Sequence, residues 1–298
     1  MGSVADKIAK KFISPRRSKD RGLAVWLEWR KIALELGFGE DGFPLDKSAM
    51  PFPCHKLYVL GHNFVSYIAG DIYPMREAKG FVRTYDDAKE DYRPSEPPMS
   101  PLTTSFFCMW AMFDIRFGSS RDTMGTCMLR VATEYDCPSW LTDVVERMQQ
   151  SRMGFYVHCG SEGKVALLRE VGTLKILSCE VASGYVGREG DIWFVRVLPP
   201  FHHLCRHHVV FNTPYVIRDF SELDFSEYLK RELARMTATR VPRRMDDAYF
   251  HLMKYGPDPN HWNEYVFLAY SNFQHEAVFL FGIPDIPQSL PHGRLARS

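Results

Sequence analysis

The chain has 298 residues, of which 45% are hydrophobic and 24% are charged. These values are typical of a globular protein and exclude a disordered, collagen-like or membrane-bundle chain. The formal net charge of +1 gives no overall field that would draw the chain to nucleic acid or anionic lipid.

The first 31 residues predict a solvated or frayed basic terminus, because nine Lys and Arg residues there face three acidic ones. The next segments are mostly helical. Residues 22–36 place apolar side chains at three- and four-residue spacing, which predicts an amphipathic helix ended by Gly37. We also expect a helix over 57–69 and an exposed loop over 86–101. Residues 102–117 fit either a buried helix or a strand, and Ser139 is expected to cap a further helix.

From about residue 154, short apolar segments separated by glycine-containing turns predict consecutive antiparallel strands. The segment 207–217 is expected to add another strand that pairs back onto 191–198, giving a meander of four to six strands. Ser221 then begins a predicted helix that runs to about Met236. Two more helices, over 242–254 and from Asp258 to Phe273, and a last strand over 276–281 follow.

Strands in one run followed by helices in another predict an α+β fold. We expect a helix-rich N-terminal region over 1–152, and an antiparallel sheet with C-terminal helices over 153–298. One continuous domain is the alternative.

Seven cysteines are scattered along the chain without a CxxC pair, at positions 54, 108, 127, 137, 159, 179 and 205. This pattern favours reduced thiols and folding without disulfides. The longest apolar run, 106–113, is too short to span a membrane. We therefore expect a cytoplasmic protein that does not associate with membranes.

The segment 202–208, with the sequence HHLCRHH, is the most suggestive one chemically. Under strand-like alternation, His203, Cys205 and His207 would point to one side and offer zinc three ligands with an open fourth position. A further ligand would come from a distant histidine, of which the candidates are His158, His251, His261 and His275. The alternative is a hairpin whose histidines are exposed and bind no metal.

Three other motifs have simpler explanations. Gly37, Gly39 and Gly42 form a literal GxGxxG, but it follows a helix instead of a strand, so we interpret it as a helix stop and loop. The segment 159–164 is interpreted as a hairpin turn. The arginines of segment 240–244 could grip a phosphate or carboxylate, although pairing with Asp246 and Asp247 is the simpler interpretation. Spacing assigns no catalytic residue.

The segment from Val186 to Pro200, followed by Thr213, Pro214 and Tyr215, resembles a β-hairpin of uncharacterised bacterial proteins, some of which carry a separate SEC-C zinc motif. The resemblance covers about 30 residues, and the SEC-C cysteines are absent. It implies a bacterial intracellular origin and a small β-unit, and it implies no activity.

These patterns predict a non-enzymatic binding or regulatory protein without a cofactor, with a protein as its partner. The alternative is a zinc-dependent hydrolase that uses His203, Cys205 and His207 as ligands. Nucleic-acid binding through the basic N-terminal residues is a third hypothesis, which the near-neutral net charge disfavours. The sequence does not indicate an oligomeric state.

Overall fold

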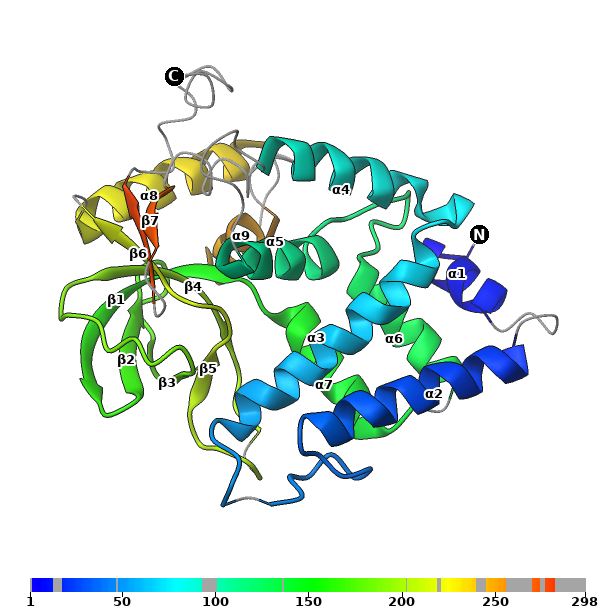
Figure 1. The fold of residues 1–298 in the computed structure, drawn as a ribbon. Coiled ribbons are helices and arrows are strands. Elements are labelled where there is room, and N and C mark those ends of the chain that lie inside the picture. Colours follow the sequence, from blue (N-terminus) through cyan, green and yellow to red (C-terminus); the bar gives the residue numbers. More distant parts are fainter. Residues whose placement is uncertain are drawn as a thin grey trace. The chain divides into compact units, whose positions relative to one another are not determined.

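The computed structural model describes residues 2–12, 18–46, 48–92, 101–135, 137–201, 203–218, 221–239, 245–255, 270–273 and 277–281 (Figure 1). It contains helices and strands, so the predicted α+β class is confirmed. The chain divides into two compact units. The helical unit comprises Met1–Asp86, Cys108–Gln150 and Phe201–Cys205, and the barrel unit comprises Asp87–Phe107, Ser151–Pro200 and Arg206–Ser298.

The first half of the chain forms helices, as Figure 1 shows in blue to green. Their bounds are α1 Val4–Phe12, α2 Ser18–Glu35, α3 Pro53–Ile72, the short 3-10 helix η1 Arg76–Ala78, α4 Lys79–Tyr92, α5 Pro101–Phe113, α6 Met124–Glu134 and α7 Ser139–Gln150. The helices predicted over 22–36, over 57–69 and from Ser139 are thus confirmed. In the described part of the chain, no helix is both long and apolar enough to cross a membrane.

Within the helical unit, α3 packs against α7 at a point of close approach. A Cβ atom on Gly61 would lie 2.4 Å from a methyl carbon of Val144, so a larger residue at Gly61 would push the two helices apart. The N-terminal helix α1 is attached to a segment that is distant in sequence, because the Ala5 backbone N–H donates to the Asp122 carboxylate over 3.0 Å. The prediction of a frayed terminus is therefore wrong for residues 4–12.

Two expectations in the middle of the chain change. Residues 86–92 belong to α4 instead of a loop, residues 93–100 lie outside the described part, and Pro101 begins α5. The ambiguous segment from 102 onward is a helix up to Phe113, and the described part of this helix is apolar on several faces, with Phe106, Phe107 and Trp110 all buried. A helix that is apolar on most of its faces is typical of a buried position.

The second half of the chain contains all the described strands and two further helices. Their bounds are β1 Met153–Glu162, β2 Val165–Glu170, β3 Ile176–Val181, β4 Ile192–Leu198, β5 His208–Val210, β6 Tyr215–Arg218, α8 Glu222–Thr239, α9 Met245–Tyr255, β7 Tyr270–Phe273 and β8 Val278–Phe281.

The strands form a closed five-stranded barrel, so the predicted meander is wrong. The order around the barrel is β1, β2, β3, β5 and β4, and β4 pairs again with β1. This order makes β5 parallel to β3, whereas a meander contains only antiparallel neighbours. The barrel closes through β4, which is buried along nearly its whole length. One edge of β4 pairs with β1, and the other edge pairs with β5 and β6. The strands β6, β8 and β7 continue the sheet outward from β4.

Several local predictions in this half need adjustment. The strand expected over 207–217 is two strands, β5 and β6, and both pair back onto β4 as predicted. The break between them includes Pro214, which has no N–H to donate to a ladder. The cap at Ser221 is confirmed by its backbone N–H, 2.7 Å from the Asp224 carboxylate. Residues 270–273 form β7 where a helix was expected, and 256–269 lie outside the described part.

Trp193 on β4 is the largest side chain in the barrel core and is fully buried. It packs among apolar residues of the neighbouring strands, which include Tyr156, Leu168, Val181 and Val210. The loop before β4 also depends on this ring, because a Cβ atom on Gly187, whose φ is +75°, would lie 2.6 Å from it. Trp193 therefore fixes both the core and the adjoining loop.

Candidate binding face of the barrel

The predicted zinc ligands have different partners in the structure. His203 is exposed and its ring lies against Phe43, with ring centroids 5.1 Å apart. The Nδ1 atom of His207 lies 3.0 Å from the Ser178 hydroxyl oxygen on β3. His202 lies outside the described part of the chain.

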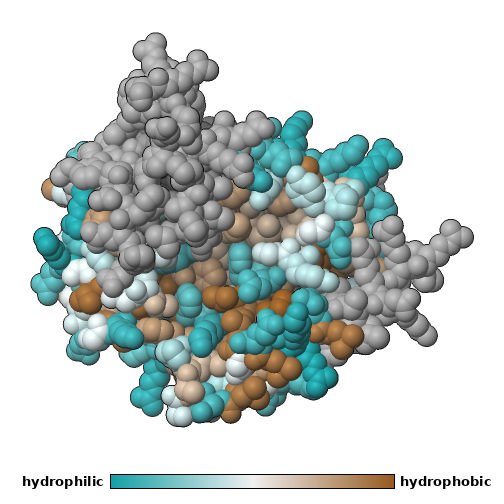
Figure 2. Space-filling model, viewed as in Figure 1, coloured by the Kyte–Doolittle hydropathy of each residue, from teal (hydrophilic) through white to brown (hydrophobic). Residues whose placement is uncertain are grey.

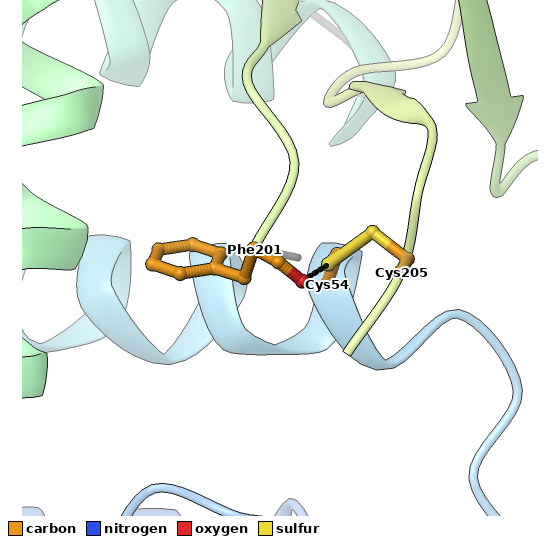
Figure 3. Close-up of a disulfide and its surroundings, with 3 residues drawn as sticks. All are labelled: Cys54, Phe201 and Cys205. Atoms are coloured by element: carbon orange, nitrogen blue, oxygen red, sulfur yellow. Dashed lines mark hydrogen bonds between the residues drawn. A yellow bond between two sulfur atoms is a disulfide. The ribbon is translucent and has the colours of Figure 1, made fainter. Parts of the chain in front are cut away.

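Cys205, the third predicted ligand, forms a disulfide with Cys54 and so has no thiolate to offer a metal (Figure 3). The assumed strand-like alternation is wrong here, because residues 201–205 form a turn in which the N–H groups of 204 and 205 both donate to the Phe201 carbonyl oxygen. Within the described ranges, no group of three or more His, Cys, Asp or Glu side chains is arranged to hold a metal ion. Zinc binding by this segment stays a prediction.

The disulfide also corrects the expectation of folding without disulfides. The five other cysteines are free, and two of them, Cys127 and Cys179, are buried. Of the distant histidines, His158 is buried in the barrel unit and His251 packs on Tyr255 within α9, whereas 261 and 275 are outside the described part, as is the arginine segment 240–244.

His158 and Ser161 form a Ser–His pair, with His158 Nε2 and the Ser161 hydroxyl oxygen 2.8 Å apart. The Gly160 N–H donates to His158 Nδ1 over 3.4 Å. The Ser161 hydroxyl donates in turn to the Val186 carbonyl oxygen over 2.9 Å. The proton of the Ser161 hydroxyl is thus directed at this carbonyl oxygen and not at His158, and the pair ties β1 to the loop before β4.

This buried histidine predicts a pH dependence of stability. Burial lowers the pKa of His158 despite the nearby carboxylate of Asp191. In the unfolded chain, histidine binds its proton near pH 6.5, whereas in the folded chain it does so only at lower pH. Protonation therefore favours unfolding, and stability should fall as the pH drops below about 6.5.

Urea denaturation between pH 7.5 and 5 measures this dependence. A His158→Gln variant keeps a hydrogen-bonding side chain without a titrating ring, so its stability should change less over this range. An equal slope in both proteins would show that His158 is not the responsible group.

The glycine-rich loop after α2 is a helix stop, as predicted. Gly37 and Gly42 have φ values of +84° and +78°, and a Cβ atom on Gly42 would lie 2.5 Å from the Trp140 ring. These glycines allow the loop to turn tightly against α7.

The outer surface of β2 and β3 carries aliphatic side chains that the core does not use. Leu167 on β2 is 38% exposed, and Ile176 on β3 is 62% exposed. Ile176 pairs with Arg169, which lies two residues from Leu167 on the same side of β2. Leu174, in the turn between the two strands, is 64% exposed. We call these three residues, Leu167, Leu174 and Ile176, the aliphatic face. Apolar side chains are also exposed at several other places on the visible surface, as Figure 2 shows in brown among teal hydrophilic side chains.

Leu174 adopts an unfavourable backbone conformation. Its φ is +59°, in the left-handed region that a non-glycine residue enters at a cost of roughly 1–3 kcal/mol. Its side chain is mostly exposed and gives little packing in return. A residue that is both strained and exposed is typical of a functional position.

Hydrogen bonds to Glu170 hold the turn that carries Leu174. The Leu174 N–H donates to the Glu170 carbonyl oxygen over 2.8 Å, and the Glu170 carboxylate accepts hydrogen bonds from Thr173 and from the Arg152 guanidinium. Burial alone would raise the pKa of Glu170, but Arg152 and Thr173 outweigh it and lower the pKa. The ring of Tyr249 on α9 packs against Gly172 and Arg152. Buried contacts of Glu170, Arg152 and Tyr249 therefore hold the turn of the aliphatic face in place.

Sequence reasoning missed this face. The alternation in β2 could have indicated that one side of the strand faces solvent, but both sides are apolar, so the pattern did not show which one. The left-handed backbone at Leu174 has no sequence signal, since leucine is rare there.

No protein-family model, curated protein or solved structure matches this chain.

Proposed function

We propose that this chain is a binding protein without catalytic activity of its own, and that it binds a protein segment rich in aliphatic side chains on the aliphatic face. Leu174 is the observation that carries the proposal, because its strained backbone costs folding energy that its exposed side chain does not recover by packing in the core.

The barrel architecture supports the location of the site. A five-stranded barrel with this strand order resembles the oligonucleotide- and oligosaccharide-binding barrels, which bind ligands on strands 2 and 3 and the adjoining loops. Such an analogy indicates where a ligand binds and leaves its chemistry open.

The chemistry of the face favours a protein ligand. Leu174 and Ile176, which are 64% and 62% exposed, would each gain roughly 1–2 kcal/mol on full burial, and Leu167, which is 38% exposed, would gain less. The neighbouring charges are paired: Arg169 makes two hydrogen bonds of 2.8 Å with Glu222, and Lys175 lies 3.9 Å from Asp246. An aliphatic centre with a polar rim is the usual anatomy of a protein interface.

The same residues disfavour a nucleic acid. Faces that bind single strands combine exposed aromatic rings with cations free to contact phosphates. Here the exposed side chains are aliphatic, Arg169 is bonded to Glu222, and the carboxylate of Glu180 on β3 would repel phosphates.

Selection from a displayed library of random peptides tests the proposal. We expect the wild-type protein to enrich aliphatic sequences, and Leu174→Gly to weaken their binding about tenfold, because one buried leucine contact is lost. Glycine tolerates a positive φ, so the same variant should keep or raise its folding stability. Weaker binding without lower stability separates a contact role from a structural one.

A labelled oligothymidine provides the opposing arm of this experiment. Tight binding of the oligonucleotide that is lost in Leu174→Gly would contradict a protein ligand and favour a nucleic acid. Selected peptides that bind wild type and Leu174→Gly equally would place the site elsewhere.

A zinc-dependent hydrolase remains the alternative. It requires reduction of the Cys54–Cys205 disulfide and movement of the turn at 201–205 before His203, Cys205 and His207 could share a metal.

A further inference from the structure

The disulfide between Cys54 and Cys205 joins two segments that are 151 residues apart in sequence. Cys54 is the second residue of α3, and Cys205 ends the turn at 201–205 that lies in the connection between β4 and β5 (Figure 3). The bond therefore attaches this turn covalently to the beginning of a long helix.

The two sulfur atoms differ in access and in charge environment. Cys54 is fully buried at the N-terminus of α3, where the helix dipole stabilises negative charge. Cys205 is half-buried, and exposed residues His203 and Arg206 lie beside it in the chain. An attacking thiolate can therefore reach Cys205 more easily than Cys54.

Noncovalent contacts also join the turn to the helices of the helical unit. The Phe201 ring lies 5.1 Å from the ring of Tyr58, and the Arg147 guanidinium lies 4.6 Å from its centroid. The turn at 201–205 thus packs noncovalently against the helices of the helical unit, and the disulfide adds a covalent bond to this contact.

The remaining cysteines also favour a reversible bond. Five of the seven are free, and one of them, Cys159, is exposed. Exposed free thiols are typical of proteins in reducing compartments, where disulfides are usually transient or redox-sensing.

We propose that the Cys54–Cys205 disulfide is a reversible redox latch, opened by a dithiol that attacks Cys205. The attacking thiolate bonds to Cys205 Sγ, the Cys54–Cys205 bond breaks, and its electron pair leaves on Cys54 Sγ, which takes a proton from water. The second thiol of the reductant then attacks the mixed disulfide and releases Cys205. One protein disulfide becomes two thiols, the dithiol becomes a disulfide, and the turn at 201–205 is free to leave α3.

Thiol counting on the full chain, with dithiothreitol as the probe, tests the latch. Protein purified without reductant should accept five maleimide groups in denaturant and, after treatment with dithiothreitol in the native state, seven. Trypsin cleavage after Arg206 should then become about tenfold faster, because proteolysis follows the population of the locally opened state. Cleavage after Arg188, exposed in another loop, should change less than about twofold.

Each contrary result overturns the latch. Seven maleimide groups before reduction would mean that the disulfide does not form, and five after native reduction would make it a sealed structural bond. Seven maleimide groups after native reduction, with an unchanged rate of cleavage after Arg206, would mean that reduction does not release the turn at 201–205 from α3. A Cys159→Ser variant should behave like wild type, apart from one thiol fewer, which excludes disulfide shuffling through the exposed thiol.

The direction of attack has its own test. With oxidised glutathione, Cys205 in a Cys54→Ser variant should form a mixed disulfide faster than Cys54 in a Cys205→Ser variant, because Cys205 is the more exposed of the two. Equal modification of both would contradict attack at Cys205.

Discussion

Replacing Glu170 with alanine is expected to lower the free energy of unfolding by about 3–5 kcal/mol, because it leaves a buried guanidinium without its carboxylate. The side chains of Glu170 and Arg152 are only 6% and 14% exposed, and their hydrogen bonds measure 2.7 and 3.2 Å. Burial disfavours the charge on Arg152, but Glu170 outweighs this and raises the pKa of Arg152. Urea denaturation followed by circular dichroism measures the loss.

Two controls make this experiment specific. Glu35→Ala removes the carboxylate of an exposed ion pair with Lys31, in which both side chains are 64% exposed, and should change stability by less than about 0.5 kcal/mol. The double variant Arg152→Met, Glu170→Leu should recover much of the loss, since it leaves no unpaired charge. A Glu170→Ala variant as stable as Glu35→Ala would refute the assignment of this pair as the support of the turn.

Replacing Trp193 with alanine is expected to cost about 3–5 kcal/mol, because it empties the centre of the barrel. The ring is fully buried, and His158 stacks on it with centroids 5.0 Å apart. The loop at Gly187 would lose the surface against which it packs. Urea denaturation again gives the measurement.

Leu167→Ala is the matched control, because Leu167 lies on the outer surface of the barrel whereas Trp193 lies in its core. Leu167 lies on the outer surface of β2 and is 38% exposed, so its truncation should cost less than about 1 kcal/mol. Equal losses at Trp193 and Leu167 would contradict the assignment of inside and outside on which the aliphatic face depends.

The sequence allowed the strands to be predicted and not the barrel. Alternating apolar residues and glycine turns mark β1 to β4 locally, whereas closure depends on Tyr156 pairing with Trp193 and on Glu180 pairing with Val209, which are distant in sequence. A run of adjacent antiparallel strands is the commonest arrangement of neighbours, so the parallel pair of β3 and β5 had no local signal.

The candidate site was predictable only in part. The segment 202–208 lies after the predicted strand 191–198 and overlaps the start of the one predicted over 207–217, but the turn at 201–205, closed on the Phe201 carbonyl oxygen, excludes the strand-like alternation of His203, Cys205 and His207. No local rule pairs Cys205 with Cys54, because only the tertiary fold brings them together. Leu174 looks like an ordinary turn residue until its backbone angle and exposure are known.

The affinity of a selected aliphatic peptide for two lysine variants tests the proposed binding face most directly. Ile176→Lys changes the face itself, and Leu45→Lys changes an aliphatic residue of the helical unit with a similar exposed fraction, 65% against 62%. We predict a loss of at least about tenfold for Ile176→Lys, as expected for burying a charge in an apolar contact, and less than about twofold for Leu45→Lys. Equal affinities of the two variants would contradict the aliphatic face as the binding site.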